Sequence, residues 1–375
     1  MEPGRSPGLD RTLSPARMTS ILAAISGSFS KALILGTFFP VTVFVLCGLL
    51  FVVPFLPGEV PLLAPLAQLD PGWKMALVTL VILLLTGLLY TLNTPLIRLY
   101  EGYPWQHSWL GKRSRERQLR RREWAESKRV AVRDLIREIK ETNRAEPSRN
   151  KAERKKAASS EAEPREPAPD VAGPPDPALA ELEVWRPRLG QRVMIEYPGA
   201  ELVLPTRLGN VIRAFEEYPR AVYGTSAIPL WPRLIAVVDK DYKPVLDEAK
   251  ASLDFMINAS FLSGLLSSSI LVAGLLVPER IHWWPWLLQL SLAALAARLF
   301  YVASIGQAAS WGAQVKGAFD LFRWDLLKKL GYERPGISPE AERELWKHIS
   351  QRMVYGNPPE GVPLMPYVRP ARPKP

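Results

Sequence analysis

Four long apolar runs, separated by polar and charged stretches, organise the chain. They cover residues 32–56, 75–97, 255–277 and 283–305. A helix of about 20 residues crosses the hydrocarbon core of a bilayer, and in lipid each backbone N–H and C=O group must be paired within its own element. The pattern therefore predicts an all-α integral membrane protein with four transmembrane helices.

Short polar connections join these runs in pairs. One connection covers residues 58–74, and the other is the sequence PERIHWW at 278–284. We therefore expect two transmembrane hairpins, with helical cytoplasmic extensions and disordered linkers. Pro95 lies near the end of the second run and predicts a bend or break there, because proline lacks the N–H group that a helix needs.

The region between the hairpins changes in composition twice. Pro and Gly are absent from 112–146, where charged helix formers dominate, and this predicts one long exposed helix. Residues 157–180 are rich in Ala, Pro, Glu and Asp and predict a disordered linker. Apolar residues return in 181–254, which predicts short amphipathic helices near the membrane. One of these has Thr206 as its N-cap and stops at Pro219.

Two further helices are predicted after the fourth run. The first reaches about Leu330 and ends at Gly331, since glycine suits the left-handed position that follows a helix. The second begins at Ser338 with Pro339 in its first turn and ends at Gly356.

These patterns divide the chain into eight segments. They are a cytoplasmic N-terminal tail (1–31), the first transmembrane hairpin (32–98), a basic juxtamembrane helical segment (99–156), a disordered linker (157–180), a cytoplasmic amphipathic helical region (181–254), the second transmembrane hairpin (255–305), cytoplasmic C-terminal helices (306–356) and a disordered tail (357–375).

Positive charge sets the expected orientation. The chain has a net charge of +11 and a pI near 9.7. Thirty Arg and Lys residues lie between Arg98 and Lys250, whereas the two short connections carry only Lys74 and Arg280. Basic loops stay in the cytoplasm, so we expect a cell-membrane protein with both termini cytoplasmic. An aromatic anchor is expected at the outer interface, formed by Trp283, Trp284 and Trp286.

Basic residues at the start of the central region form the expected membrane-surface site. They are Lys112, Arg113, Arg115, Arg117, Arg120, Arg121 and Arg122. Lys and Arg side chains close to a bilayer are attracted to anionic lipid headgroups. The plainer alternative is a solvated helix whose charges only retain the topology. Nucleic acid is not expected as a partner, because no aromatic interleaving and no nucleic-acid-binding motif accompanies these charges.

Polar and small residues inside the last two runs need an explanation. Arg298 is an intramembrane charge, and we expect it to reach the cytoplasmic interface or to pair with Asn258 or Asp254. An ion or substrate pathway is the sharper alternative. Small residues at a four-residue spacing predict close packing of the third run against the fourth, with a polar pore lining as the alternative. These small residues are Ser260, Gly264 and Ser268.

No residue cluster predicts catalysis. The chain has one cysteine, Cys47, and three histidines far apart in sequence, so neither a disulfide nor a metal site is expected. It has no phosphate-binding glycine loop, zinc-protease motif or nucleophile elbow. No spacing brings the acidic candidates together, so we expect no enzyme activity, no catalytic residue and no cofactor. Those candidates are Glu101, Glu216, Glu217 and Asp254.

Three stretches have a recognisable pattern. They are TPLIRLYEGYPW at 94–105, LPTRLGNVIRAFEEYPRAVYGTSAIPLWPRL at 204–234 and AFDLFRWDLLKKL at 318–330. In this order they resemble a group of uncharacterised prokaryotic multi-pass membrane proteins. The resemblance covers the chain from the first span to about Tyr355 and implies a bacterial-type cytoplasmic membrane. It implies no activity, cofactor or catalytic residue.

The expected function is that of a non-enzymatic membrane interaction or scaffold protein. Most polar sequence is expected in the cytoplasm, where a protein partner or the inner leaflet would bind at a motif formed by Thr206, Arg207, Asn210 and Trp231. The alternative is a subunit of a channel or transporter, which the serine-rich third run and Arg298 motivate. Four spans are few for a transport pathway, so this alternative requires a homo-oligomer.

Overall fold

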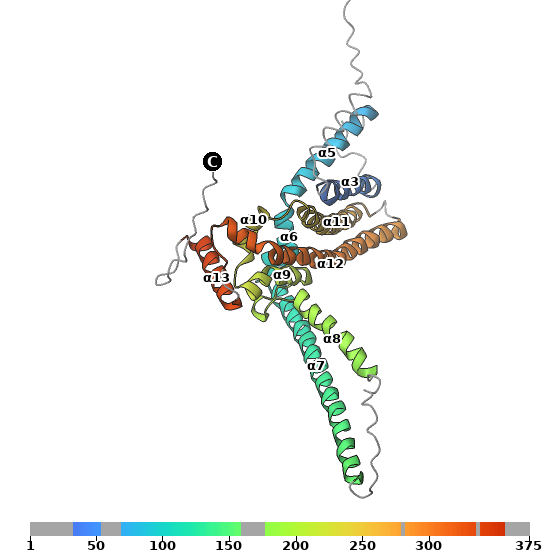
Figure 1. Cartoon of the computed structure of the whole chain (residues 1–375). Coiled ribbons are helices and arrows are strands. Elements are labelled where there is room, and N and C mark those ends of the chain that lie inside the picture. Colours follow the sequence, from blue (N-terminus) through green and yellow to red (C-terminus); the bar gives the residue numbers. More distant parts are fainter. Residues whose placement is uncertain (1–32, 54–68, 159–176, 279–281, 335–337, 357–375) are drawn as a thin grey trace, which may run out of the picture. The chain divides into compact units, whose positions relative to one another are not determined.

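A computed structural model describes residues 33–53, 69–158, 177–278, 282–334 and 338–356 (Figure 1). Within these residues all regular structure is helical and no strand occurs. The expected N-terminal and C-terminal tails, and most of the expected linker, lie outside the described residues. The described part of the chain therefore belongs to the all-α class.

Contacts divide the chain into two compact units. Unit 1 consists of Met1–Ile97 and Asp239–Trp311, and unit 2 consists of Arg98–Val238 and Gly312–Pro375. Helix α6 (Asn93–Glu101) and the long helix α12 contribute residues to both units. The four apolar runs thus fall in unit 1, whereas the basic segment and the last helix fall in unit 2.

Three helices are long and apolar enough to cross a membrane. They are α5 (Pro71–Thr91), α11 (Lys243–Leu276) and α12 (Trp283–Lys329). The first apolar run forms a π-helical turn, η1 (Ile34–Phe38), which leads into α3 (Phe39–Phe51). This first apolar helix is shorter than the other three. Three of the four predicted spans are therefore present as helices of spanning length.

Some helix boundaries differ from the prediction. The break between α5 and α6 falls at Leu92, shortly before Pro95, as the missing proline N–H group predicts. Helix α11 begins well before the apolar run at 255, because helix-forming charged residues extend it toward the N-terminus. Helix α12 continues past residue 305 to Lys329, although the sequence predicts a separate helix after 305. No proline occurs between 286 and 329, so nothing stops α12 earlier.

Serine side chains connect α11 to α12 within unit 1. The Ser260 hydroxyl donates to the Ala297 carbonyl at 2.9 Å, and the Ser267 hydroxyl donates to the Leu290 carbonyl at 3.4 Å. The contacts progress in opposite directions along the two helices, as expected for antiparallel neighbours. Each bond pairs a hydroxyl that lipid would leave unsatisfied.

The predicted row of small residues is corrected at one position. Ser260 faces α12, and a Cβ atom at Gly264 would lie 3.9 Å from the Cβ atom of Ala297. Ser268 instead is exposed and bonds to the Gly264 carbonyl of its own helix. Ser267 faces α12 in its place, because a period of 3.6 residues per turn requires a step of three after a step of four.

Asn258 is fully buried and holds the π-helical turn. Its amide nitrogen donates to the Gly36 carbonyl at 2.8 Å and to the Thr37 hydroxyl at 3.4 Å. A π-helical turn leaves irregular carbonyl positions, and a buried amide can satisfy one of them. Asn258 is therefore engaged by the first apolar run and does not pair with Arg298, contrary to one predicted pairing.

Arg298 also lacks the second predicted partner. Asp254 pairs with Lys250 at 2.5 Å, one turn earlier on α11. The Arg298 side chain is exposed, and its guanidinium lies 5.6 Å from the centre of the Tyr301 ring. The predicted pairing is therefore corrected to a cation–π contact one turn along the same helix, which suits a side chain that extends along the helix surface.

Trp286 packs directly against Gly274. Its indole N–H group donates to the Ile270 carbonyl at 3.1 Å, and the ring is buried. A Cβ atom at Gly274 would lie 2.3 Å from the indole nitrogen, so only glycine permits this approach. The predicted aromatic anchor is corrected accordingly, because Trp286 is a packing residue and only Trp283 and Trp284 are exposed.

Unit 2 is built from longer and shorter helices. Figure 1 shows α7 and α8 side by side, and α8 also packs against α9. We call the α7–α8 pair the arm. The elements are η3 (Tyr103–Trp105), α7 (Trp109–Ala158), α8 (Pro177–Glu196), η4 (Ala200–Leu202), α9 (Arg207–Tyr223), α10 (Ala227–Ile235), the end of α12, and α13 (Pro339–Tyr355).

Helix α9 begins as predicted and ends later than predicted. The Thr206 hydroxyl accepts from the Gly209 N–H group at 2.9 Å, which confirms the N-cap. Pro219 lies inside the helix, which continues to Tyr223 and ends at Gly224 with φ of +75°. A proline costs the helix one hydrogen bond, and burial of the apolar face of α9 outweighs this local preference.

The predicted ends of the last two helices are confirmed. Gly331 follows α12 with φ of +82°, and Gly356 follows α13 with φ of +78°. The Ser338 hydroxyl accepts from the Ala341 N–H group at 3.4 Å at the start of α13.

Replacing Gly274 with alanine is expected to destabilise unit 1. The added methyl group must displace a buried, hydrogen-bonded indole ring, and overpacking of this kind costs about 1–3 kcal/mol. Gly87→Ala on α5 is the matched control, because its methyl group meets no atom within 4 Å. Thermal unfolding of both detergent-solubilised variants measures the difference, and equal melting temperatures would contradict the packing.

Candidate functional site

The first two motif stretches interlock at the start of α9. The Thr206 hydroxyl donates to the backbone carbonyl of Glu101 at 3.0 Å. A Cβ atom at Gly209 would lie 2.3 Å from that same carbonyl oxygen, so glycine is needed for the close approach. The fully buried Asn210 amide donates to the Leu204 carbonyl at 3.1 Å and accepts from the Leu204 N–H group at 2.7 Å.

The residues of the predicted partner-binding motif mainly stabilise the fold of unit 2. Thr206 and Asn210 use their polar atoms inside unit 2. Arg207 bonds to Glu196 of α8 at 3.4 Å, and the partly buried Trp231 ring lies 6.1 Å from the Phe319 ring. The four residues therefore hold α8, α9, α10 and α12 together, and they do not form one exposed surface.

A cluster of charged side chains lies beside this interlock. Arg213 of α9 bonds to Glu216 at 3.4 Å and to Glu217 at 2.9 Å. Glu101 is only 6% exposed. Burial, followed by the nearby Glu216 carboxylate, raises the pKa of Glu101 to about 7 against the opposing charge of Arg98. Burial also raises the pKa of Glu216.

The spacing of residues along the sequence does not predict this charged cluster. Glu101 and Glu216 are far apart in the chain, and packing of α6 against α9 brings their charges together. A buried carboxyl with a raised pKa is a frequent property of functional sites. Burial and a neighbouring carboxylate are also typical of structural ion-pair networks, and the Arg213 pairs with Glu216 and Glu217 form such a network.

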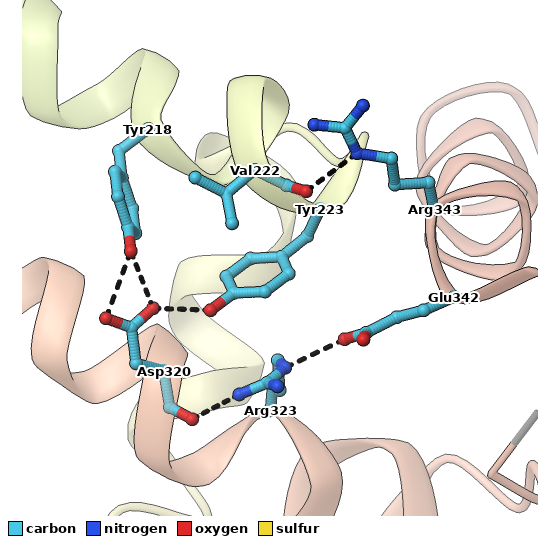
Figure 2. A network of polar contacts seen from close by, with 7 residues as sticks. All are labelled: Tyr218, Val222, Tyr223, Asp320, Arg323, Glu342 and Arg343. Atoms are coloured by element: carbon cyan, nitrogen blue, oxygen red, sulfur yellow. Dashed lines mark hydrogen bonds and ion pairs between the residues drawn. The ribbon is translucent and has the colours of Figure 1, made fainter. Parts of the chain in front are cut away.

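The second and third motif stretches interlock around Asp320 (Figure 2). The Tyr218 hydroxyl bonds to the two carboxylate oxygens at 2.9 and 3.0 Å, and the Tyr223 hydroxyl donates to the same carboxylate at 2.6 Å. Burial and the hydrogen bond to Asp320 raise the pKa of both tyrosines. Two neutral hydroxyl donors thus hold one charged acceptor between α9 and α12.

Arg323 extends this network to the last helix. Its guanidinium stacks on the Tyr223 ring at 4.6 Å, donates to the Asp320 backbone carbonyl and bonds to Glu342 of α13 at 2.8 Å. Arg343 of α13 donates in return to the Val222 carbonyl at 2.9 Å. Figure 2 shows these side chains converging from three helices. Charged hydrogen bonds of this kind are stronger than neutral ones.

The predicted membrane-surface residues divide into two groups. Arg115 donates to the carbonyls of Glu201 and Val203, and Arg122 donates to the Pro198 carbonyl. The other five are exposed, and they are Lys112, Arg113, Arg117, Arg120 and Arg121. Arg115 and Arg122 therefore hold the segment before α9, which corrects the prediction that they belong to a membrane-surface site.

A hollow of about 450 Å³ lies between the two helices of the arm. Its lining residues are Arg129, Val130, Arg133, Glu183, Pro187 and Gly190. The lining charges already have partners: Arg129 pairs with Glu126, Arg133 with Asp134, and Lys140 with Glu183. This internal pairing leaves little unbalanced charge with which to hold an ionic ligand.

Known proteins give no guide to the chemistry. Among the described residues no group of three His, Cys, Asp or Glu side chains is placed to hold a metal ion. No family model, curated protein or solved structure matches the chain. The function is therefore inferred from the contacts and surfaces of this chain.

Replacing Asp320 with asparagine is expected to destabilise unit 2 by about 2–3 kcal/mol. The change keeps the shape but removes the charged acceptor that two half-buried hydroxyls share. Asp325→Asn is the matched control, because Asp325 lies on the same helix and is exposed. Thermal unfolding in detergent measures both variants, and the double mutant with Tyr223→Phe measures the coupling. Additive effects of the two changes would contradict a shared bond.

Glu101→Gln is expected to flatten the pH dependence of stability. The folded pKa is about 7 and the ordinary value is 4.5, so the folded chain binds the extra proton between these values. The contribution of Glu101 to the free energy of unfolding is therefore complete below about pH 4.5 and is lost as the pH rises to about 7. Above pH 7 the variant is expected to gain up to about 3 kcal/mol.

The exposed Glu116→Gln variant is the control for this titration. Thermal unfolding across the pH range compares the parent with both variants. A parent protein whose stability rises between pH 4.5 and 7 would contradict a buried, protonated Glu101.

Proposed function

We propose that this chain is a non-enzymatic scaffold protein of the cell membrane, with four transmembrane helices in two hairpins. Three apolar helices of spanning length support the membrane assignment. The first apolar run supplies the fourth span in this proposal, since its sequence stays uncharged through residue 56. The serine bonds between α11 and α12, joined by a short connection, support the second hairpin.

The proposed orientation places both termini and unit 2 in the cytoplasm. The two short connections carry one basic residue each, whereas the region between the hairpins carries thirty. This asymmetry is the physical signal that determines topology in multi-pass proteins.

One observation carries the scaffold proposal. The three motif stretches direct their polar side chains at one another, through Thr206 and Glu101 and through Tyr218, Tyr223 and Asp320. Their hydrogen bonds join α6, α9 and α12 within unit 2. These bonds fix the arrangement of the helices in unit 2, and a scaffold protein needs such a fixed arrangement to present a binding surface.

The arm is the proposed partner-binding element of this scaffold. It exposes large apolar side chains, among them Leu135 of α7 and Val184 of α8. Exposed apolar groups on a pair of packed helices are typical of protein-binding surfaces. A cytoplasmic protein that buries these side chains is the proposed partner.

A channel or transporter subunit is the second candidate. The observation that favours it is the exposed Arg298 in a helix of spanning length, because such a charge often faces another subunit. The serines of α11 support it less, since Ser260 and Ser267 bond to α12 carbonyls. A closed homo-oligomer with no protein partner would favour this candidate.

Val184→Asp is expected to release a protein partner from the full-length chain. A new charge on the arm must be desolvated on binding, so we expect an affinity loss of about tenfold or more. Val354→Asp on α13 is the matched control, because both valines are 54% exposed. Affinity purification from native membranes in mild detergent, followed by native mass spectrometry, measures the partner stoichiometry.

A stoichiometric second protein that persists with Val354→Asp and disappears with Val184→Asp supports the proposal. A preparation that contains only copies of this chain, in parent and variants alike, overturns it in favour of the second candidate.

A further inference from the structure

The first five turns of α7 present one exposed face of mixed basic and aromatic side chains. Its members recur at intervals of four and three residues, which places them on one side of a helix. We call this surface the basic face, and it consists of Trp109, Arg113, Arg117, Arg120, Trp124 and Lys128, with Leu110 and Arg121 beside them.

The opposite side of α7 is fixed inward. Gln118 and Ala125 are buried, and Arg115 and Arg122 bond to backbone carbonyls between Pro198 and Val203. These bonds prevent α7 from rotating about its axis. The basic face is therefore held outward by the packing of unit 2.

The basic face combines charge with exposed apolar area. Trp109 is 70% exposed and Leu110 is 62% exposed. Arg113 lies 5.7 Å from the centre of the Trp109 ring, and Lys128 lies 5.9 Å from the centre of the Trp124 ring. Between 109 and 128, six exposed basic residues stand against two exposed acidic residues, Glu116 and Glu123. The complementary partner is an anionic surface with an apolar layer beneath it.

We propose that the basic face docks on anionic phospholipid headgroups of the membrane that the same chain spans. The candidate span α5 ends at Thr91 and α7 begins at Trp109, so chain connectivity keeps the start of the basic face close to a bilayer. Basic side chains at such a surface are attracted to acidic lipids. Tryptophan and leucine insert at the headgroup level, where they lose contact with water.

A nucleic acid fits the basic face less closely. Stacking on single-stranded bases would use Trp109 and Trp124, whereas their faces already hold Arg113 and Lys128. Leu110 has no function in nucleic-acid recognition and a clear one at a lipid surface. The proposal rests on the proposed function, because acidic lipids face the cytoplasm.

The test uses the full-length chain with Cys47→Ser and a single new cysteine. Leu110→Cys carries an environment-sensitive fluorophore, and the protein is placed in lipid nanodiscs with or without anionic phospholipid. We expect blue-shifted emission and protection from a water-soluble quencher only in anionic discs, with both effects weakened by salt. The exposed Thr142→Cys, farther along α7, is the control position and is expected to show neither effect.

A matched pair of variants tests which charges are responsible. Arg117→Gln with Arg121→Gln removes two arginines one turn apart from the basic face. Arg133→Gln with Arg137→Gln removes two arginines with the same spacing farther along the helix. The first pair is expected to lower the equilibrium constant for docking at least about tenfold, and the second pair to leave it unchanged.

Each other outcome overturns the proposal. Equal protection of the probe in neutral and anionic discs means that apolar insertion alone holds the helix. Protection by added single-stranded DNA, without any effect of anionic lipid, identifies nucleic acid as the occupant. In cells, the unlabelled Leu110→Cys variant is expected to react with an impermeant thiol reagent only after permeabilisation. Reaction in intact cells overturns the proposed orientation itself, independently of the lipid result.

Discussion

Unit 2 depends on the polar network around Asp320 and Arg323, because α9, the end of α12 and α13 meet there. Two tyrosine hydroxyls from α9 donate to this carboxylate. Arg323, one turn later, continues the network to Glu342 of α13. A charge removed from water is costly unless its hydrogen bonds are satisfied, and the half-buried Asp320 carboxylate accepts them from two tyrosines. These bonds and the Arg323–Glu342 pair give the three helix segments one fixed arrangement.

In unit 1, too, polar side chains in the interior need hydrogen-bond partners, although these side chains are uncharged. Asn258 and Ser260 lie in an apolar helix, where each buried polar atom without a partner costs roughly 1–3 kcal/mol. Asn258 bonds to the irregular η1 turn and Ser260 to a carbonyl of α12. Polar residues in a predicted span therefore act here as packing contacts, which weakens their value as evidence for a transport pathway.

Local sequence signals predict where helices end better than they predict which helices are in contact. Thr206, Ser338 and Gly331 mark helix ends, because capping geometry depends on only a few neighbouring residues. Pro219 misleads for the opposite reason, since burial of α9 overrides its local effect. Glu101 lies close to Glu216, and Tyr218 to Asp320, only because segments distant in sequence pack together. Only the three motif stretches hint at these contacts, because all four residues lie within them.

The two classes of arginine on α7 show how periodicity adds to composition. A count of charges treats Arg115 and Arg117 alike, although they lie on different sides of the helix. The inward positions Arg115, Gln118 and Arg122 recur at steps of three and four, as do the outward positions. The segment from Pro198 to Val203 holds only the short 3-10 turn η4, and its carbonyls at Pro198, Glu201 and Val203 accept from the arginines of α7. The inward arginines hold this segment, and in doing so they determine which basic residues remain available to a membrane surface.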